Sequence, residues 1–268
     1  MNGEPWLPAW DAELYAENTA HHRAYDQSFL DSTPLRPDHR LVDLGCGTGD
    51  FTRMLADRLP GGEVMGIDPQ PAFIDDARRR AGPNQRFGVG TGQRLVDALG
   101  GESFDGILSR AALHWAPGAD QALIARQVFR SIEPGGFFRL DMGGAGNIPR
   151  TVALLDSVSM ALGGPTAPWC FPDPAWYLEI LEATGFEIEA GHVRSVAQRR
   201  PFTEESVWGW LESQVFAAYE TEMESSSVEP FRRHTRDRLT ELRRHDGTFD
   251  QTFVRLDVLA FVPAHRGR

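Results

Sequence analysis

The sequence predicts an α/β fold: a mostly parallel seven-stranded sheet with helices on both faces and added helical insertions. Short apolar runs alternate with amphipathic helical patterns through residues 36–145, as expected for repeated strand–helix units. A glycine-rich turn joins the first apolar run to the helix that follows, which is typical of nucleotide-binding α/β folds. Residues 146–175 and 200–248 carry helical patterns that such a sheet does not require.

The first expected element is a helix over residues 11–30. Four of its side chains recur at three- or four-residue spacing, which places them near one face of the helix. They are Tyr15, Asn18, His22 and Tyr25. Adjacent residues on a helix do not face each other, so we do not expect His21 and His22 to bind a metal together. Prolines within residues 32–39 then separate this helix from the first strand.

A glycine-rich turn follows the first strand. The apolar run at residues 41–44 predicts that strand, and apolar residues at helical spacing in 51–59 predict the next helix. Three glycines lie between them: Gly45, Gly47 and Gly49. Glycine permits positive φ angles and lets a ligand approach the backbone without meeting a Cβ atom.

Two carboxylates indicate which ligand this turn binds. Asp43 lies just before the turn, where it would repel the pyrophosphate of a dinucleotide but attract a cationic amino group. The expected second strand, 63–68, ends in Asp68, which can accept hydrogen bonds from both hydroxyls of a ribose. An amine and a ribose without phosphate describe S-adenosylmethionine. An NAD(P)-dependent oxidoreductase is the alternative, and Asp43 disfavours it.

Strand and helix patterns continue to the end of the chain. We expect further strands at residues 86–89, 104–108, 137–142, 187–196 and 252–262, and helices at 73–81, 120–132 and 174–184. In the fifth strand, Arg139 and Asp141 alternate with apolar residues, which is unusual for a strand buried on both faces. These two side chains either face a ligand cavity or pair with each other.

Three helices are expected in the insertions, at residues 148–162, 203–215 and 228–244. Thr203, with acidic residues after it, is typical of a helix N-terminus. Trp208 and Phe216 either line a ligand cavity or form the apolar core of the insertion.

Four sequence blocks carry a resemblance to a known family. They are VDLGCGTG at 42–49, VMGID at 64–68, FDGILSRAALHW at 104–115 and IEPGGFF at 132–138. In this order they resemble the class I S-adenosylmethionine-dependent methyltransferases, which have a Rossmann-like core. The pair His114 and Trp115 is similar to the branch that contains trans-aconitate and juvenile hormone acid methyltransferases. The resemblance implies S-adenosylmethionine as cofactor, S-adenosylhomocysteine as product and a small-molecule acceptor.

The resemblance also implies a set of cofactor-binding residues. They are Asp43, Gly45, Gly47, Asp68, Pro69, Thr91, Gly92, Gln93, Ser109 and Arg110. Family members usually carry an acid after the third strand that hydrogen-bonds the adenine amino group, whereas Thr91 and Gln93 stand at this place here. A hydroxyl or amide oxygen can still accept that hydrogen bond.

Acceptor-binding residues are expected on the first helix and at the strand ends: Tyr15, His22, Tyr25, Trp115 and Arg139. In the juvenile hormone acid methyltransferases a polar side chain of the first helix contacts the substrate, and His22 aligns with it. His22 and His114 are candidate general bases, because an imidazole pKa of about 6.5 suits proton removal near neutral pH. Alternatively, His22 is an ordinary surface residue and His114 packs the loop.

The expected reaction follows from the cofactor. Its methyl group is already activated, so the protein mainly aligns the nucleophile and excludes water. A carboxylate acceptor needs no base, whereas a phenol, amine or carbon acceptor does. We expect O-methylation of a carboxylate or hydroxyl. The alternatives are C-methylation of an anionic or activated carbon skeleton in secondary metabolism, and a non-catalytic cofactor-binding module. Arginines at 139, 150, 194, 199 and 200 are possible anchors for an anionic acceptor; alternatively, most of them are solvated surface residues.

Composition limits the partners. The net charge is −11 and all 27 basic residues are arginines, so nucleic acid is not an expected partner. Cys46 and Cys170 form neither a disulfide framework nor a metal-ligand spacing. Neither a bilayer-spanning apolar run nor a signal-peptide pattern is found, so we expect a cytoplasmic protein, a monomer or homodimer without membrane partners.

These observations predict the following domain organisation. A helical arm over the active site spans 1–35, the cofactor-binding core 36–145, helical lids 146–175 and 200–248, and the remaining sheet elements 176–199 and 249–268.

Overall fold

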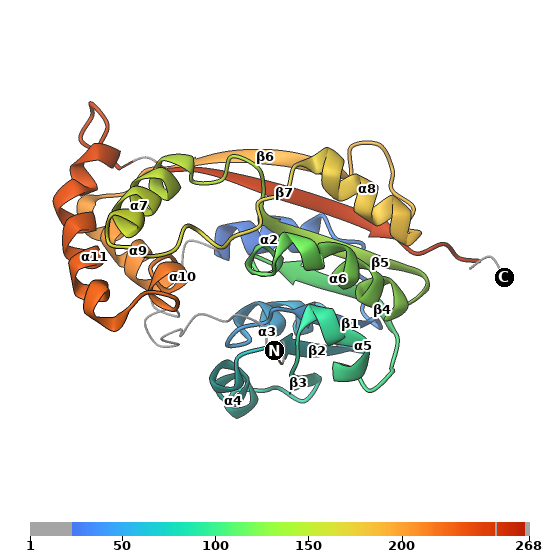
Figure 1. The fold of residues 1–268 in the computed structure, drawn as a ribbon. Coiled ribbons are helices and arrows are strands. Elements are labelled where there is room, and N and C mark those ends of the chain that lie inside the picture. The colour runs from blue at the N-terminus through green and yellow to red at the C-terminus, as the bar shows by residue number, and fades with distance from the viewer. Residues whose placement is uncertain (1–22, 250, 266–268) are drawn as a thin grey trace. The chain divides into compact units, whose positions relative to one another are not determined.

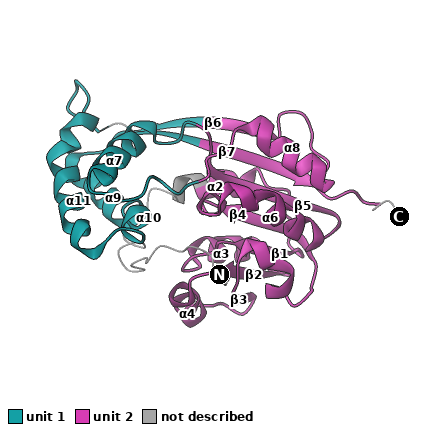
Figure 2. Cartoon of the chain, in the orientation of Figure 1, with its two compact units in different colours: residues 1–20, 146–169, 197–254 teal, residues 21–145, 170–196, 255–268 magenta. Residues whose placement is uncertain are grey.

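The computed structural model describes residues 23–249 and 251–265 (Figure 1). The chain divides into two compact units, shown in different colours in Figure 2. Among the described residues, the helical unit comprises 146–169, 197–249 and 251–254, and the sheet unit comprises 23–145, 170–196 and 255–265. Strands β6 (Val193–Arg200) and β7 (Gln251–Phe261) run from one unit into the other.

The sheet has seven strands in the order β3-β2-β1-β4-β5-β7-β6. The first five strands are β1 (Arg40–Leu44), β2 (Glu63–Asp68), β3 (Gln85–Val89), β4 (Phe104–Arg110) and β5 (Ile132–Gly143). These five pair in parallel, whereas β7 pairs antiparallel with β5, so the predicted mostly parallel sheet is confirmed. The strand order reverses between β1 and β4, and open sheets of this kind bind ligands beside the carboxyl ends of the strands at such a point.

Helices cover both faces of this sheet, as predicted. The helices of the sheet unit are α2 (Arg23–Asp31), α3 (Asp50–Ala56), α4 (Pro71–Arg79), α5 (Leu95–Ala98), α6 (Gln121–Arg130) and α8 (Pro174–Thr184). On one face, Phe29 of α2 and Leu55 of α3 pack with Leu41 of β1. On the other face, Ile124 of α6 packs in one cluster with Phe138 of β5.

Strand β6 begins later than the sequence predicted. The expected span was 187–196, whereas the strand is Val193–Arg200, and Glu187 pairs with Phe261 as an isolated bridge before it. A turn that contains Gly191, with φ at +84°, separates this bridge from the start of the strand at Val193.

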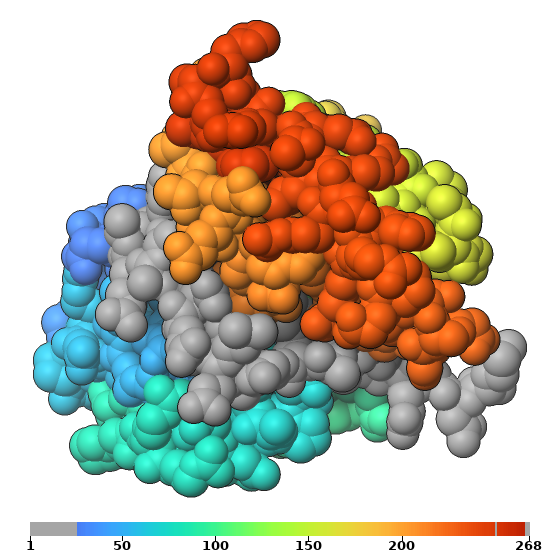
Figure 3. All heavy atoms as spheres, turned by 90° about the vertical axis from the view of Figure 1, so that its left-hand side faces the viewer, coloured from blue at the N-terminus to red at the C-terminus, as the bar shows by residue number. Residues whose placement is uncertain are grey.

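The helical unit contains α7 (Pro149–Ala161), α9 (Glu204–Gln214), α10 (Ala217–Glu220) and α11 (Ser225–Arg238). Figure 3 shows the face of this unit on which α11 forms much of the surface. Thr203 accepts a hydrogen bond from the Ser206 amide, which confirms the predicted start of α9. Phe216 is fully buried against Trp208 and Phe231, at ring distances of 5.4 and 5.5 Å. This packing favours the interpretation of Phe216 as part of the apolar core of the unit.

Two expectations about the fold stay predictions. The N-terminal arm lies mostly outside the described residues, and the role of the helical segments as lids over an active site is untested.

Within the described residues, none of the helices has both the length and the apolar character needed to span a membrane.

Candidate functional site

The glycine turn adopts the backbone conformation that its sequence predicts. Gly45, Gly47 and Gly49 have φ angles of +83°, +53° and +80°. A Cβ atom on Gly45 would lie 2.2 Å from the Cβ atom of Ala112, so the turn packs closely against the segment after β4. A Cβ atom on Gly47 would have no heavy atom within 4 Å among the described residues, which leaves its backbone open to a ligand.

Asp43 lies at the end of β1, fully buried beside this turn. The Thr52 hydroxyl on α3 donates a hydrogen bond of 2.6 Å to its Oδ2 atom. Burial raises the pKa of Asp43 to about 7; the Thr52 hydrogen bond and, to a smaller extent, Arg110 oppose the rise, and nearby Asp68 and Asp26 add to it. A cationic group placed beside this buried carboxylate would stabilise its ionised form. The amino group of S-adenosylmethionine is such a group.

Asp68 ends β2 and holds the glycine turn in place. Its two carboxylate oxygens accept hydrogen bonds of 2.9 Å from the amides of Gly47 and Gln70. Burial raises the pKa of Asp68 to about 6, and the two amide hydrogen bonds oppose this rise. Because a carboxylate can accept about four hydrogen bonds, Asp68 retains capacity for the two hydroxyls of a ribose. The next residue, Pro69, leads into α4.

The segment expected to meet the adenine follows β3. Gln93 donates from Nε2 to Oδ2 of Asp120 at 3.1 Å, which leaves its amide oxygen to accept from an amino group. Thr91 and Gly92 precede it, and Gly92 packs against Ile124, where a Cβ atom would lie 3.0 Å from the side chain. The sequence analysis did not name Asp120 as a site residue, because it lies 27 positions after Gln93 in the chain. The fold nevertheless places its carboxylate next to Gln93.

The end of β4 carries Ser109 and Arg110. The Ser109 hydroxyl donates to the Leu44 carbonyl at 2.7 Å, so it holds the end of β1. Arg110 forms a buried ion pair with Asp26 of α2, and their side chains are 9% and 8% exposed. The sequence analysis missed Asp26, which lies four residues after His22 in the sequence, a spacing that on the expected helix would have placed both near one face.

His114 is buried in the loop after β4. Its Nδ1 atom accepts a hydrogen bond of 3.4 Å from the Gly143 amide, and its ring lies 5.7 Å from that of Trp115 and 5.9 Å from that of Phe171. Burial lowers the pKa of His114 to about 3, and the positive charge of Arg255 contributes. With Nδ1 acting as acceptor, the neutral ring carries its proton on Nε2, so His114 is a hydrogen-bond donor at that atom.

Comparison with known proteins agrees with this geometry. Residues 41–136 match the methyltransferase domain family. An uncharacterised methyltransferase of Schizosaccharomyces pombe is 30% identical over 214 residues, covering 76% of this chain and 79% of that protein. The chain belongs to the class I S-adenosylmethionine-dependent methyltransferases.

Two further proteins are similar to this methyltransferase along nearly its whole length. Trans-aconitate 2-methyltransferase of Mycobacterium tuberculosis is 26% identical over 271 residues, covering 96% of this chain and 98% of that protein. The crystal structure of the YcgJ protein from Bacillus subtilis superposes with a TM-score of 0.62 at 17% identity, covering 92% of this chain and all of that one. The second likeness supports the fold alone.

Arg139 and Asp141 on β5 of this methyltransferase do not pair with each other. Arg139 instead forms a buried ion pair with Asp257 on β7 and donates to the Ser32 hydroxyl at 3.0 Å. Asp141 accepts a hydrogen bond of 2.6 Å from Nε of Arg255 on β7. Because the Arg139 guanidinium is occupied by these partners, its predicted contact with the acceptor has no support from the geometry.

Of the other residues predicted to bind the acceptor, the structure describes only some. Tyr15 and His22 lie outside the described residues, as does the side chain of Tyr25. Trp115 lies beside His114 in the loop after β4, where the sequence analysis expected it. Its contact with an acceptor stays a prediction.

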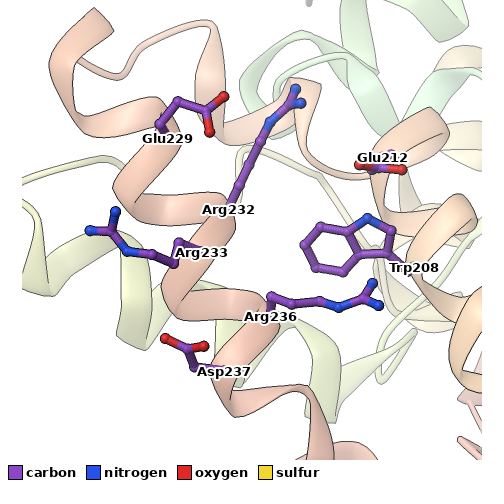
Figure 4. Close-up of a pocket in the computed structure, with 7 residues that line it drawn as sticks. All are labelled: Trp208, Glu212, Glu229, Arg232, Arg233, Arg236 and Asp237. Atoms are coloured by element: carbon purple, nitrogen blue, oxygen red, sulfur yellow. The ribbon is translucent and has the colours of Figure 1, made fainter.

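The helical unit also has a pocket of about 400 Å³ between α9 and α11 (Figure 4). It is lined by Trp208, Glu212, Glu229, Arg232, Arg233, Arg236 and Asp237. Arg232 binds Glu220 through two hydrogen bonds, and Arg236 lies 4.6 Å from the Trp208 ring centre, toward which it extends in Figure 4. These contacts engage two of the three arginines with other side chains of the helical unit.

Proposed function

We propose that this methyltransferase transfers the methyl group of S-adenosylmethionine to a carboxylate of a small organic acid. The buried, neutral state of His114 is the observation that carries the proposal. A group with a pKa of about 3 is a very weak base, so it does not remove a proton efficiently from a phenol, an amine or a carbon acid. A carboxylate is already ionised at neutral pH and needs no base.

The bound cofactor supplies a methyl group on a positively charged sulfonium, ready for attack by a nucleophile. Asp43 and Asp68 are proposed to hold the amino group and the ribose, and Gly47 to let the cofactor lie against the backbone. Arg110, fixed by Asp26, is proposed to limit the negative charge that these two carboxylates build up. The protein thereby fixes the position of the methyl group relative to the acceptor.

Relatives named trans-aconitate 2-methyltransferases support the choice of acceptor class, since trans-aconitate is a tricarboxylic acid. The M. tuberculosis relative matches 96% of this chain, including the helical unit as well as the sheet unit. The names of these relatives and the extent of the match both support an organic acid as the methyl acceptor.

A transfer assay with methyl-labelled S-adenosylmethionine tests the proposal. Trans-aconitate and other organic acids are compared with a catechol and a primary amine of similar size. We expect label transfer to acids only, and its loss in Asp68→Ala, which removes the proposed ribose contact. Transfer to the catechol or the amine but to no acid would contradict the proposal.

A further inference from the structure

Arg255 is a mostly buried cation at the carboxyl ends of the parallel strands. Its side chain is 12% exposed. It lies near the start of β7, and in the antiparallel register its partner on β5 is Gly143. Side chains of such paired residues stand side by side on one face of a sheet. Gly143 has no side chain, so β5 places none opposite Arg255.

The strand register puts Arg255 on the same face of the sheet as Asp43. Asp43 pairs with Leu108 on β4, and Leu108 pairs with Arg139 on β5. Arg139 pairs in turn with Leu259 on β7. Paired residues share a face, as do residues separated by an even number of positions on one strand. Arg255 is four positions from Leu259, so it faces the side on which Asp43 is expected to bind the cofactor.

Asp141 occupies only part of the Arg255 guanidinium. The Nε atom donates to Oδ1 of Asp141 at 2.6 Å, and Nη2 donates to the Asp141 carbonyl at 3.2 Å. An arginine has five N–H donors, of which Nη1 carries two. In the part of the chain that the structure describes, Nη1 donates no hydrogen bond.

A second donor without an assigned partner lies close by. The Gly143 amide that follows Asp141 on β5 binds Nδ1 of His114, so the imidazole proton is on Nε2. The charge of Arg255 also reaches His114, where it lowers the imidazole pKa. Arg255 and His114 thus flank the same glycine, and both offer N–H groups. Two such donors, one of them cationic, are suited to a carboxylate.

We propose that Arg255 and His114 form a subsite for a carboxylate of the acceptor other than the one that is methylated. A carboxylate held by a guanidinium has its lone pairs engaged in hydrogen bonds, which makes it the poorer nucleophile of two. The inference rests on the proposed function, and it narrows the acceptor to acids with at least two carboxylates.

Binding measurements test this subsite without requiring turnover. Calorimetry measures the affinity of trans-aconitate, and of the monocarboxylate crotonate, for the protein saturated with S-adenosylhomocysteine. Arg255→Lys keeps a positive charge beside Asp141 but removes the second N–H edge of the guanidinium. Arg194→Gln is the matched control, since Arg194 also pairs with an aspartate, Asp257 on β7, but its side chain is 61% exposed.

We expect Arg255→Lys to bind trans-aconitate about 10- to 100-fold more weakly than the wild type, as the loss of charge-assisted hydrogen bonds implies. Its affinities for crotonate and S-adenosylhomocysteine, and its melting temperature, should stay at the wild-type values. The affinity of Arg194→Gln should change by less than about twofold, because exposed ion pairs contribute little.

Equal binding of trans-aconitate by the wild type and Arg255→Lys would overturn the subsite, as would equal losses for both acids or no binding to the wild type. Transfer assays on the same proteins separate this inference from the proposed function. Arg255-dependent binding without methylation of any acid would support the subsite and refute the proposed function. Methylation of acids that is unaffected in Arg255→Lys would have the opposite meaning.

Discussion

Replacing Asp43 with asparagine should change both the pH dependence of stability and the affinity for the cofactor. Asp43 is fully buried, and its pKa is raised from an ordinary value of 3.8 to about 7. In the unfolded chain it loses its proton near pH 4. Between these two values the folded state therefore binds more protons, so the free energy of unfolding falls as the pH rises from about 4 to 7. Asparagine has the same shape but does not titrate.

The size of the effect follows from the two pKa values. Their difference corresponds to at most about 4 kcal/mol lost by the wild type across this range. Because Asp68 interacts with Asp43 and titrates in part of the same range, we expect about 2 kcal/mol to disappear in Asp43→Asn. The variant should also bind S-adenosylhomocysteine about 10- to 100-fold more weakly at pH 7.5, because the carboxylate that receives the amino group is gone.

Urea unfolding of the cofactor-free protein at pH 4.5 and 7.5 measures the first effect, and calorimetry measures the second. The quantity of interest is the change in unfolding free energy between the two pH values, in the variant relative to the wild type. Asp57→Asn is the control, because Asp57 is exposed at the end of α3 and should show neither effect. The same pH slope and the same affinity in Asp43→Asn as in the wild type would refute the role given to Asp43.

Three further predictions concern the surroundings of this site. Gly45→Ala places a Cβ atom 2.2 Å from that of Ala112 at a φ of +83°, so S-adenosylhomocysteine binding should be lost and the melting temperature lowered; calorimetry and a thermal melt check this. In the wild type, kcat for a carboxylate acceptor should be constant from pH 6 to 8, since His114 stays neutral throughout this range. A rise in kcat governed by a pKa near 6.5, and absent in His114→Gln, would show that His114 acts as a base. Asp26→Asn leaves Arg110 as a buried charge without its carboxylate and should cost about 3 kcal/mol in urea unfolding. The double variant Asp26→Asn/Arg110→Gln should recover part of this loss. A larger loss of unfolding free energy in the double variant than in Asp26→Asn would argue against the ion pair.

The parts of the site that the sequence predicted well are set by neighbouring residues in the chain. Asp43, the glycine turn and α3 form a continuous strand–turn–helix, so their pattern of apolar residues and glycines indicates their conformation directly. Asp68 was predicted for the same reason, as the acid at the end of a short apolar strand. Their roles in binding the cofactor are consistent with this geometry and stay predictions.

The parts that the sequence did not predict depend on contacts between distant residues. Asp26 and Arg110 are 84 positions apart, and Asp141 and Arg255 are 114 apart. No local pattern says which acid meets which arginine, because this is decided by the strand order and by the register of β7 against β5. The state of His114 was likewise hidden, since its burial and its contact with Gly143 appear only in the folded chain.

The proposal that the acceptor is a carboxylate is tested most directly by the chemical nature of the methylated product. The labelled product of trans-aconitate is treated with mild alkali, which hydrolyses a methyl ester but leaves a C-methyl group or an aryl ether intact. We predict that all of the label is released as methanol. Label that remains on the organic acid after alkali would contradict O-methylation of a carboxylate and would indicate methyl transfer to carbon.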